Sequence, residues 1–126
     1  MDKFSNKKIK PAFSDKRGDI IDILEIPVSH VGMVTFSKGA IRGNHYHKKS
    51  VQYSFVLDGK IEFTLIKLGE EKSKKIILTK GDLTTIPPGF IHTYRALANS
   101  SMLDLTTYPR GKKGYEADTV RVIAGK

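Results

Sequence analysis

Short β-rich segments, separated by glycine and proline, recur about every ten residues along most of this chain. No long window carries the apolar stripe of an amphipathic helix. Runs of this kind predict strands, and their regular spacing favours a sandwich or a barrel, whose closure removes exposed strand edges. We therefore predict an all-β fold, with strands at residues 31–36, 51–57, 60–67, 74–78, 83–86, 92–97 and 101–108.

Two further patterns give local predictions. Residues 19–26 are rich in isoleucine and end at Pro27, which predicts an early strand. Asp58 and Gly59 separate two alternating β-rich runs. Such a pair is the strongest local signal for a β-hairpin, because both central residues of a type I′ turn need a positive φ. We therefore expect a hairpin at this point.

The length of 126 residues fits one domain, since domains usually have about 100 to 200 residues, and 39% hydrophobic residues suffice for a core. We predict a single domain over residues 1–126, with an N-terminal arm at about 1–12 and a C-terminal tail at about 110–126. The arm is basic, and the tail contains one β-like piece at 119–123. Ends of this kind either pair with a neighbouring subunit or fray.

The composition excludes several kinds of chemistry. The chain has no cysteine, so any metal must take nitrogen and oxygen ligands. No stretch of about 18 apolar residues occurs, so we expect no membrane partner and a cytoplasmic location. The net charge of +9 is scattered over expected turns and exposed strands, without a basic helix or a basic and aromatic stacking pattern. We therefore expect no nucleic-acid partner, although the charge would attract a small anion.

Three of the four histidines can meet at one site. His45 and His47 are two residues apart, so their side chains lie on the same face of a strand. His92 follows a Pro-Pro-Gly turn about forty residues on and can join them from a distant strand. Three imidazoles can hold one metal ion or contact one substrate.

The histidines and their flanking glycines are spaced as in the two motifs of the cupin family. The first motif is a glycine, five residues, His-X-His, three or four residues, a glutamate, six residues and a glycine; it corresponds to Gly39, His45, His47, Gln52 and Gly59. The second is a glycine, five residues, Pro-X-Gly, two residues, a histidine, three residues and an asparagine; it corresponds to Gly81, Pro87, Gly89, His92 and Ala96. The resemblance covers residues 39–96 and implies a double-stranded β-helix, the cupin jelly-roll barrel, with the site inside.

Two positions depart from the cupin pattern. Gln52 stands where cupins usually have glutamate, and Ala96 stands where the second motif ends in asparagine. The resemblance implies a divalent metal, such as zinc, nickel, manganese or iron, held by His45, His47 and His92. Gln52 would be a weaker fourth ligand, because a neutral amide removes one negative charge from the site. A metal-free site, in which one imidazole acts as general base, is the alternative.

A narrower resemblance concerns the residues around the histidine pair. Arg42 and Gly43 before it, and Lys48 and Lys49 after it, resemble the cupins of bacterial sugar-nucleotide and surface-polysaccharide pathways. These include the dTDP-4-keto-6-deoxyglucose 3,4-ketoisomerases, which also match at Gln52, and the C-terminal cupin domain of capsular UDP-sugar reductase/epimerases. In the metal-free ketoisomerases the paired histidines act on the sugar directly, whereas in the capsular domains they hold zinc. Residues 116–121 resemble the family's closing acidic and arginine-containing segment, and the family also implies a homodimer.

Two more side chains are candidates for substrate binding. Arg42 can clamp a phosphate or a keto oxygen with two parallel donors, or it can pair with a surface carboxylate. Tyr94 shares the strand face of His92 and can line the same pocket. The ketoisomerases place tyrosines on the strand before the histidine pair, and this chain has none at residues 31–36.

These features predict a sugar-nucleotide isomerase or epimerase of polysaccharide biosynthesis that acts on a 4-keto-hexose. The reaction would be proton abstraction beside the ketone through an enediolate, with His45 or His47 as the base. A bound metal, Arg42 or a lysine would stabilise the oxyanion. The expected ligand is a nucleotide-linked sugar. The alternatives are a non-catalytic cupin that binds a small sugar or acid, and a metal-dependent dioxygenase that uses the same histidines on iron.

Overall fold

The computed structural model describes residues 3–109 and 117–122, and within these ranges the chain forms twelve strands. In chain order these strands are β1 (Ser5–Lys8), β2 (Phe13–Asp15), β3 (Gly18–Ile20), β4 (His30–Phe36), β5 (Ile41–His47), β6 (Gln52–Asp58), β7 (Lys60–Lys67), β8 (Ser73–Thr79), β9 (Asp82–Ile86), β10 (Phe90–Ala96), β11 (Ser100–Thr106) and β12 (Thr119–Arg121). Across the same ranges, no helix is both long and apolar enough to span a membrane.

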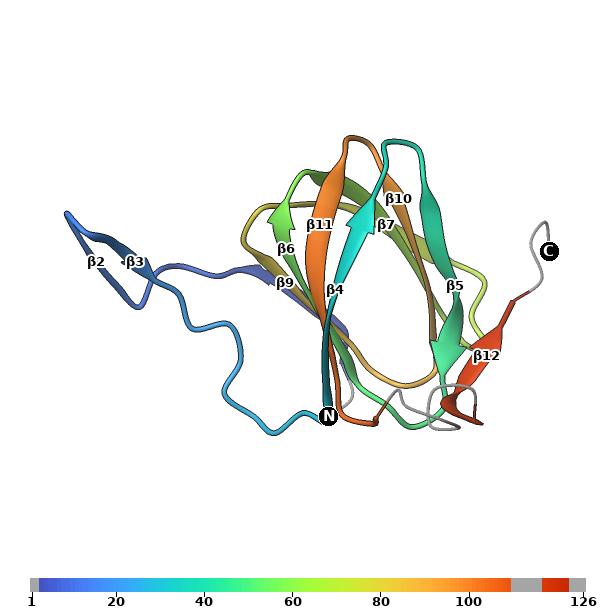
Figure 1. Cartoon of the computed structure of the whole chain (residues 1–126). Coiled ribbons are helices and arrows are strands. Elements are labelled where there is room, and N and C mark those ends of the chain that lie inside the picture. Colours follow the sequence, from blue (N-terminus) through green and yellow to red (C-terminus); the bar gives the residue numbers. More distant parts are fainter. Residues whose placement is uncertain (1–2, 110–116, 123–126) are drawn as a thin grey trace.

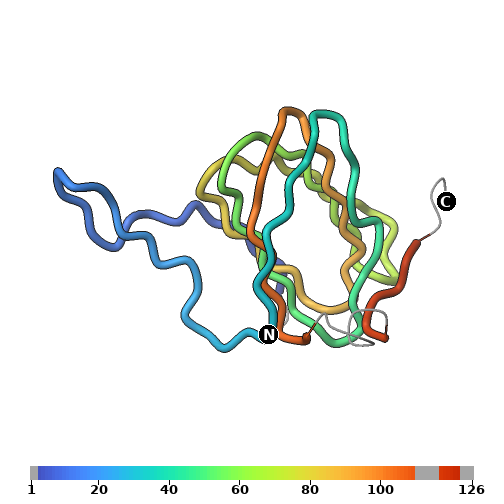
Figure 2. Tube along the Cα trace, in the orientation of Figure 1, coloured from blue at the N-terminus to red at the C-terminus, as the bar shows by residue number. Residues whose placement is uncertain are grey.

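Ten strands form two five-stranded antiparallel sheets that face each other (Figures 1 and 2). The strand order is β1-β9-β6-β11-β4 in one sheet and β12-β5-β10-β7-β8 in the other. From β4 onward the chain repeatedly passes from one sheet to the other, as between β4 and β5 and between β10 and β11. This is the connectivity of a jelly roll, so the prediction of an all-β jelly-roll fold is confirmed.

Side-chain alternation places the core between the two sheets. On β7 every second residue is buried, namely Ile61, Phe63 and Leu65. Val56 on β6 and Leu78 on β8 reach the same interior and have no exposed surface. Burial of such side chains contributes roughly 25 cal/mol per Å² of apolar surface, which makes this layer the main source of stability. It also gives the polar residues of the interior a rigid frame.

Asp58 and Gly59 do not form the predicted hairpin. β6 pairs with β9 and β11 in one sheet, whereas β7 pairs with β8 and β10 in the other. Gly59 has a φ of 101°, but the φ of Asp58 is not positive, so the corner is not a type I′ turn. A jelly roll needs corners at which the chain changes sheets, and a local turn signal cannot distinguish such a corner from a hairpin.

The N-terminal part also differs from the prediction. The strand predicted at residues 19–26 is wrong beyond Ile20, where β3 ends, because no strand of the described chain lies alongside residues 21–26. β2, which the sequence did not indicate, pairs with β3 in a hairpin that stands away from the barrel (Figure 1). The N-terminal arm contains β1, which pairs with β9.

The expected C-terminal tail falls in part outside the described residues, which omit 110–116 and 123–126. Its β-like piece is shorter than predicted and forms β12, which pairs with β5 at the edge of the second sheet.

Candidate functional site

The structure brings His45, His47 and His92 together. β5 carries the first two and β10 carries the third, and the two strands pair so that His92 lies directly opposite His45. The ring centroids are 4.8 Å apart for His45 and His92, 5.0 Å for His45 and His47, and 5.4 Å for His47 and His92. One nitrogen from each ring lies within 4.8 Å of the others. The predicted histidine cluster is therefore a physical cluster.

A β-bulge beside the cluster sets the position of His45. The register of β5 and β10 shifts between His92 and Thr93, where Asn44 has a φ of 61° and Gly43 a φ of 95°. A Cβ atom at Gly43 would lie 2.7 Å from the carbonyl oxygen of His92. Only glycine permits this close approach of the two backbones. The bulge therefore explains why a glycine stands two residues before His45.

His92 is fully buried and neutral. Its Nδ1 lies 3.0 Å from the carbonyl oxygen of Phe90, which can only accept, so Nδ1 carries the hydrogen. Burial, followed by the nearby charge of His45, lowers the pKa of His92 from 6.5 to about 3. Its Nε2 is buried and has no hydrogen-bond partner among the described residues. A neutral imidazole with an unpaired Nε2 suits a metal ion or a ligand hydroxyl.

His47 is held on both of its ring nitrogens. Nε2 lies 2.9 Å from Oε1 of Gln52, and Nδ1 lies 3.3 Å from Oγ1 of Thr119 and 3.5 Å from Oδ2 of Asp118. Asp118 is itself buried and accepts a hydrogen bond of 2.7 Å from the backbone N–H of Lys49. The sequence does not predict the contacts of Asp118 and Thr119 with His47, although residues 116–121 resemble the family's closing segment.

Gln52 and Tyr94 belong to one buried polar network. Nε2 of Gln52 donates to Oη of Tyr94 at 3.1 Å, and Oη also lies 2.6 Å from Oγ of Ser54. Burial, with a smaller contribution from the charge of Asp104, raises the pKa of Tyr94 well above its usual value. The phenol therefore stays protonated over the whole physiological range and can act as a hydrogen-bond donor.

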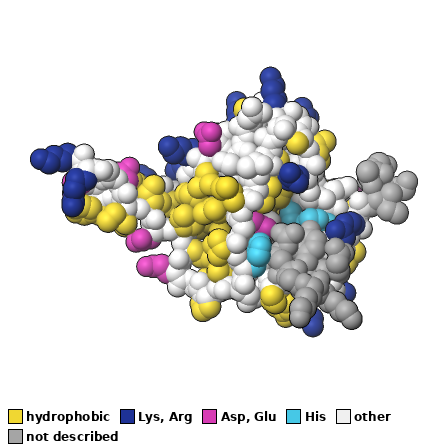
Figure 3. All heavy atoms as spheres, viewed as in Figure 1, with side chains coloured by type: hydrophobic (Ala, Val, Ile, Leu, Met, Phe, Trp, Pro, Cys, Tyr) yellow, Lys and Arg dark blue, Asp and Glu magenta, His cyan; other side chains and the backbone are white. Residues whose placement is uncertain are grey.

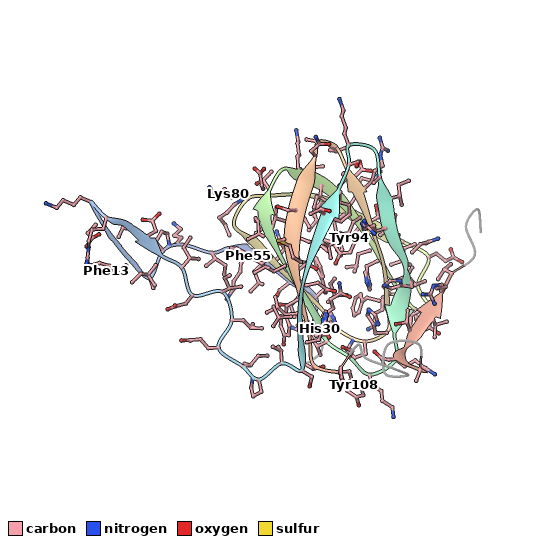
Figure 4. All side chains as sticks on the ribbon, in the orientation of Figure 1. Phe13, His30, Phe55, Lys80, Tyr94 and Tyr108 are labelled. Carbon is pink, nitrogen blue, oxygen red and sulfur yellow. The ribbon has the colours of Figure 1, made fainter. Side chains whose placement is uncertain are left out.

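A cavity of about 200 Å³ opens beside this network at the seam between β4 and β5. Figure 4 shows Tyr94 among the side chains between the two sheets. The cavity is smaller than the ~300 to 1,000 Å³ typical of sites for drug-sized ligands, so it suits one ring of a larger ligand. The side chains and backbone that line it are Val34, Arg42, Gly43, His45, Gln52, Tyr94, Met102 and Asp104.

Arg42 lies at this cavity but does not pair with a surface carboxylate among the described residues. Its Nη2 and Nε donate to the carbonyl oxygen of Thr35 at 3.0 and 3.3 Å, and its guanidinium carbon lies 5.4 Å from the ring centre of Phe36. The contact with β4 fixes the guanidinium across the seam between the sheets. The remaining donors of Arg42 can serve an anionic or keto oxygen.

The residues of the cluster fit a divalent metal. Metal–nitrogen bonds of about 2.1 Å allow two ligand nitrogens to be at most about 4.2 Å apart, so a spacing of up to 4.8 Å requires only small rotations. An ion at Nε2 of His47 would replace the hydrogen bond to Gln52, and Asp118 at Nδ1 would then orient the ligand from behind. Three imidazoles and an amide suit zinc, nickel, manganese or iron.

An antiparallel jelly roll with a histidine cluster and a cavity inside is the architecture of a small-molecule-binding β-barrel. The family model described as the cupin domain matches residues 32–107, more than half of the chain. The chain therefore belongs to the cupin domain family. The matched range includes all three histidines of the cluster.

Several solved structures resemble this one over nearly the whole chain. QdtA, a 3,4-ketoisomerase from Thermoanaerobacterium thermosaccharolyticum, seen as a double mutant in complex with TDP, is 25% identical with a TM-score of 0.77, covering 94% of this chain and 87% of that one. The dTDP-4-dehydrorhamnose 3,5-epimerase from Sulfolobus tokodaii is 24% identical with a TM-score of 0.75, covering 96% and 76%. A 3,4-ketoisomerase from Helicobacter canadensis is 19% identical with a TM-score of 0.81, covering 97% and 92%. The last two support the fold only. A comparison with curated protein sequences gave no match.

Proposed function

We propose that this cupin is an isomerase or epimerase of nucleotide-linked 4-keto-hexoses. The observation that carries the proposal is the cluster of His45, His47 and His92 beside a cavity that also presents Arg42 and Tyr94. The similarity to the ketoisomerase QdtA supports this class of substrate. The cavity would take the sugar ring, because its volume is too small for a whole nucleotide sugar.

An imidazole of the cluster would act as the base. It would take the proton from the carbon beside the ketone, and the electron pair of the C–H bond would move to the carbonyl oxygen to form an enediolate. Return of the proton to the opposite face of the same carbon gives an epimer. Return to the neighbouring carbon, with the hydroxyl proton moving between the two oxygens, gives the isomeric ketone.

The position of His45 on the cavity supports its role as that base, whereas both ring nitrogens of His47 already contact protein groups. Nε2 of His47 donates to the amide oxygen of Gln52, which can only accept, and Nδ1 contacts Asp118 and Thr119. These contacts hold the His47 ring in one orientation.

The enediolate oxygen needs a donor or a positive charge. Arg42 and the protonated hydroxyl of Tyr94 both reach the cavity. A divalent metal held by His45, His47 and His92, with Gln52 as a weaker ligand, would supply Lewis-acid stabilisation of that oxygen when bound. Loss of one such donor commonly costs on the order of 2.7 to 4 kcal/mol of transition-state stabilisation.

The proposal extends to the state of the whole protein. We infer that residues 1–126 act as one cupin domain, that the protein is a homodimer, and that it works in the cytoplasm on a nucleotide-linked sugar. The exposed apolar side chains of β2, β3 and β4 support the dimer, because a second copy could cover them.

Hydrogen exchange with solvent tests the proposed reaction directly. Protein purified without a histidine tag is analysed for metal and then incubated in deuterated water with a dTDP- or UDP-linked 4-keto-6-deoxyhexose. We expect deuterium to enter the sugar beside the ketone, as measured by mass spectrometry and NMR. His47→Asn and His45→Asn should lower the rate, whereas Thr64→Ser on the outer face of β7 should leave it unchanged.

Other outcomes identify the alternatives. Tight binding of the sugar nucleotide without any deuterium exchange would contradict the enzyme and support a non-catalytic binding cupin. Oxygen uptake by an iron-loaded protein would instead support a dioxygenase.

A further inference from the structure

His30, the histidine outside the cluster, begins β4 on the opposite sheet from the other three. Along β4 the inward residues include Val34, which lines the cavity, and Phe36, which belongs to the core. Because strand side chains alternate, His30 faces the same interior. Figure 4 labels His30 near the N-terminal end of β4.

A glycine makes room for the His30 ring. A Cβ atom at Gly32 would lie 2.9 Å from Cε1 and 3.1 Å from Nε2 of His30. The imidazole therefore leans along β4 over Gly32, in the direction of Val34. Gly32 lies directly opposite Asp104, and both Val34 and Asp104 line the cavity. The His30 ring thus lies over Gly32, beside two residues that line the cavity, on the sheet opposite His45.

The strand register also places His30 level with the histidine cluster. Thr106 lies opposite His30 on β4 and opposite Gln52 on β6, so the three residues form one row across the sheet. Gln52 in turn contacts His47. Neighbouring strands are about 4.8 Å apart and facing sheets about 10 Å apart. Side chains that reach in from both sheets at this level can contact the same small ring.

One nitrogen of His30 lacks a partner. Nδ1 is buried and forms no hydrogen bond to any residue that the structure describes. Buried polar nitrogens nearly always have a partner, because leaving one unpaired is costly. An imidazole nitrogen can donate or accept, depending on its tautomer, so it suits the hydroxyl and keto oxygens of a sugar.

We propose that His30 hydrogen-bonds the hexose ring of the substrate from the sheet opposite His45 and His47, and that Gly32 keeps the imidazole in place. This inference rests on the proposed function and names a further residue of the same site. His30 is a substrate-binding residue, whereas Gly32 acts only through His30.

A double-mutant cycle tests this arrangement. His30→Ala should lower kcat/KM for the 4-keto-hexose substrate by about tenfold. Gly32→Ala should cause a similar loss, since its φ is not in the left-handed region and the added methyl group displaces only the His30 ring. In the His30→Ala background, Gly32→Ala should have no further effect, because no ring is left to displace. Thr64→Ser, on the outer face of β7 and away from the site, is the control.

A second measurement needs no turnover. In protein with nitrogen-15-labelled histidine, dTDP-glucose should shift the Nδ1 signal of His30 in NMR spectra, and dTDP alone should leave it unchanged. The signal is assigned by its disappearance in His30→Ala. Circular dichroism and urea unfolding establish that each variant is folded.

The outcomes separate this inference from the proposed function. If the wild type turns over substrate and both single variants stay within about twofold of it, the role of His30 is wrong and the proposed function stands. If the wild type turns over no substrate, the proposed function is wrong, and the NMR measurement alone then tests whether His30 contacts the sugar. A shift with dTDP-glucose would then support its contact with the sugar, and no shift at saturating ligand would overturn it.

Discussion

Gln52 connects the two parts of the site through one side chain. Its amide oxygen contacts Nε2 of His47, and its amide nitrogen donates to Tyr94. The side chains that could hold a metal are three imidazoles, all without a negative charge. At the scale of a residue, the neutral amide at this position therefore limits how strongly the site can attract a divalent ion.

We predict that Gln52→Glu raises the affinity of the site for zinc by about tenfold or more, because a carboxylate adds a negative charge and a stronger ligand. Competition with a chelator on metal-free protein measures the change. Gln52→Leu, which removes the amide without adding charge, should not raise the affinity. Equal zinc affinities for the wild type and Gln52→Glu would show that the ion does not bind beside residue 52.

The buried His92 leads to a prediction for folding stability. Its pKa falls from 6.5 to about 3 on folding, chiefly because burial penalises the charged form. Between these values the unfolded chain binds one more proton than the native protein, so the free energy of unfolding increases with pH. For metal-free protein, we predict a loss of about 3 kcal/mol between pH 7 and pH 4 from this residue.

Urea unfolding at a series of pH values measures this dependence. His92→Gln should unfold more easily at neutral pH but should lose this part of the slope. An unchanged slope in the variant would show that other groups cause the acid sensitivity.

The sequence predicts the members of the cluster better than their contacts. Alternation along a strand suffices to put His45 and His47 on one face. The contact between Asp118 and His47 spans about seventy residues and depends on the pairing of β12 with β5. Arg42 donates to the backbone of Thr35 because β4, the edge strand of one sheet, lies beside β5 of the other sheet. Neither pairing leaves a local signal in the sequence.

At the scale of elements, the corner between β6 and β7 depends on Gly59. A Cβ atom there would lie 2.6 Å from the carbonyl oxygen of Asn99 and would collide with the side chain of Ser100. Oγ of Ser100 accepts a hydrogen bond from the backbone N–H of Lys60, so moving Ser100 would break this bond. The φ of 101° at residue 59 would also strain an alanine, and this cost adds to the steric one. We therefore predict that Gly59→Ala lowers the free energy of unfolding by about 3 kcal/mol in urea denaturation.

Gly69 provides the matched control for this prediction. Its φ of 85° is also positive, but no atom lies within 4 Å of a Cβ atom built there. Gly69→Ala should therefore cost only the backbone strain, about 1 kcal/mol. Equal costs for the two substitutions would contradict the steric explanation of the corner.

Periodicity in the sequence locates most strands of the barrel but not their partners. The ranges predicted for β4 and for β6 to β11 agree with the structure to within two residues at either end. The pairing of β6 with β9 and β11 brings together segments that are distant in the chain, so alternation cannot reveal it. Residues 19–26 have a β-rich composition too, and they fail as a strand where no partner lies beside them.

At the scale of the whole molecule, a single copy leaves a large apolar surface exposed. Val31 and Met33 on β4 are 59% and 66% exposed, and Phe13 and Ile20 on the projecting hairpin are 51% and 57% exposed. Figure 3 shows hydrophobic side chains gathered over the hairpin and over the neighbouring face of the barrel. An isolated two-stranded hairpin is at best marginally stable, and a contiguous apolar surface marks an interaction site.

We predict that the wild type is a homodimer and that Met33→Lys dissociates it, because a lysine on this face would bring a charge into the apolar interface. Sedimentation velocity measures the oligomeric state, and circular dichroism should show that the exposed substitution leaves the barrel folded. Ile77→Lys is the matched control, since Ile77 is 45% exposed on β8 of the other sheet and should leave the dimer intact. A wild type that sediments as a monomer, or a Met33→Lys variant that stays dimeric, would show that a second copy does not cover this face.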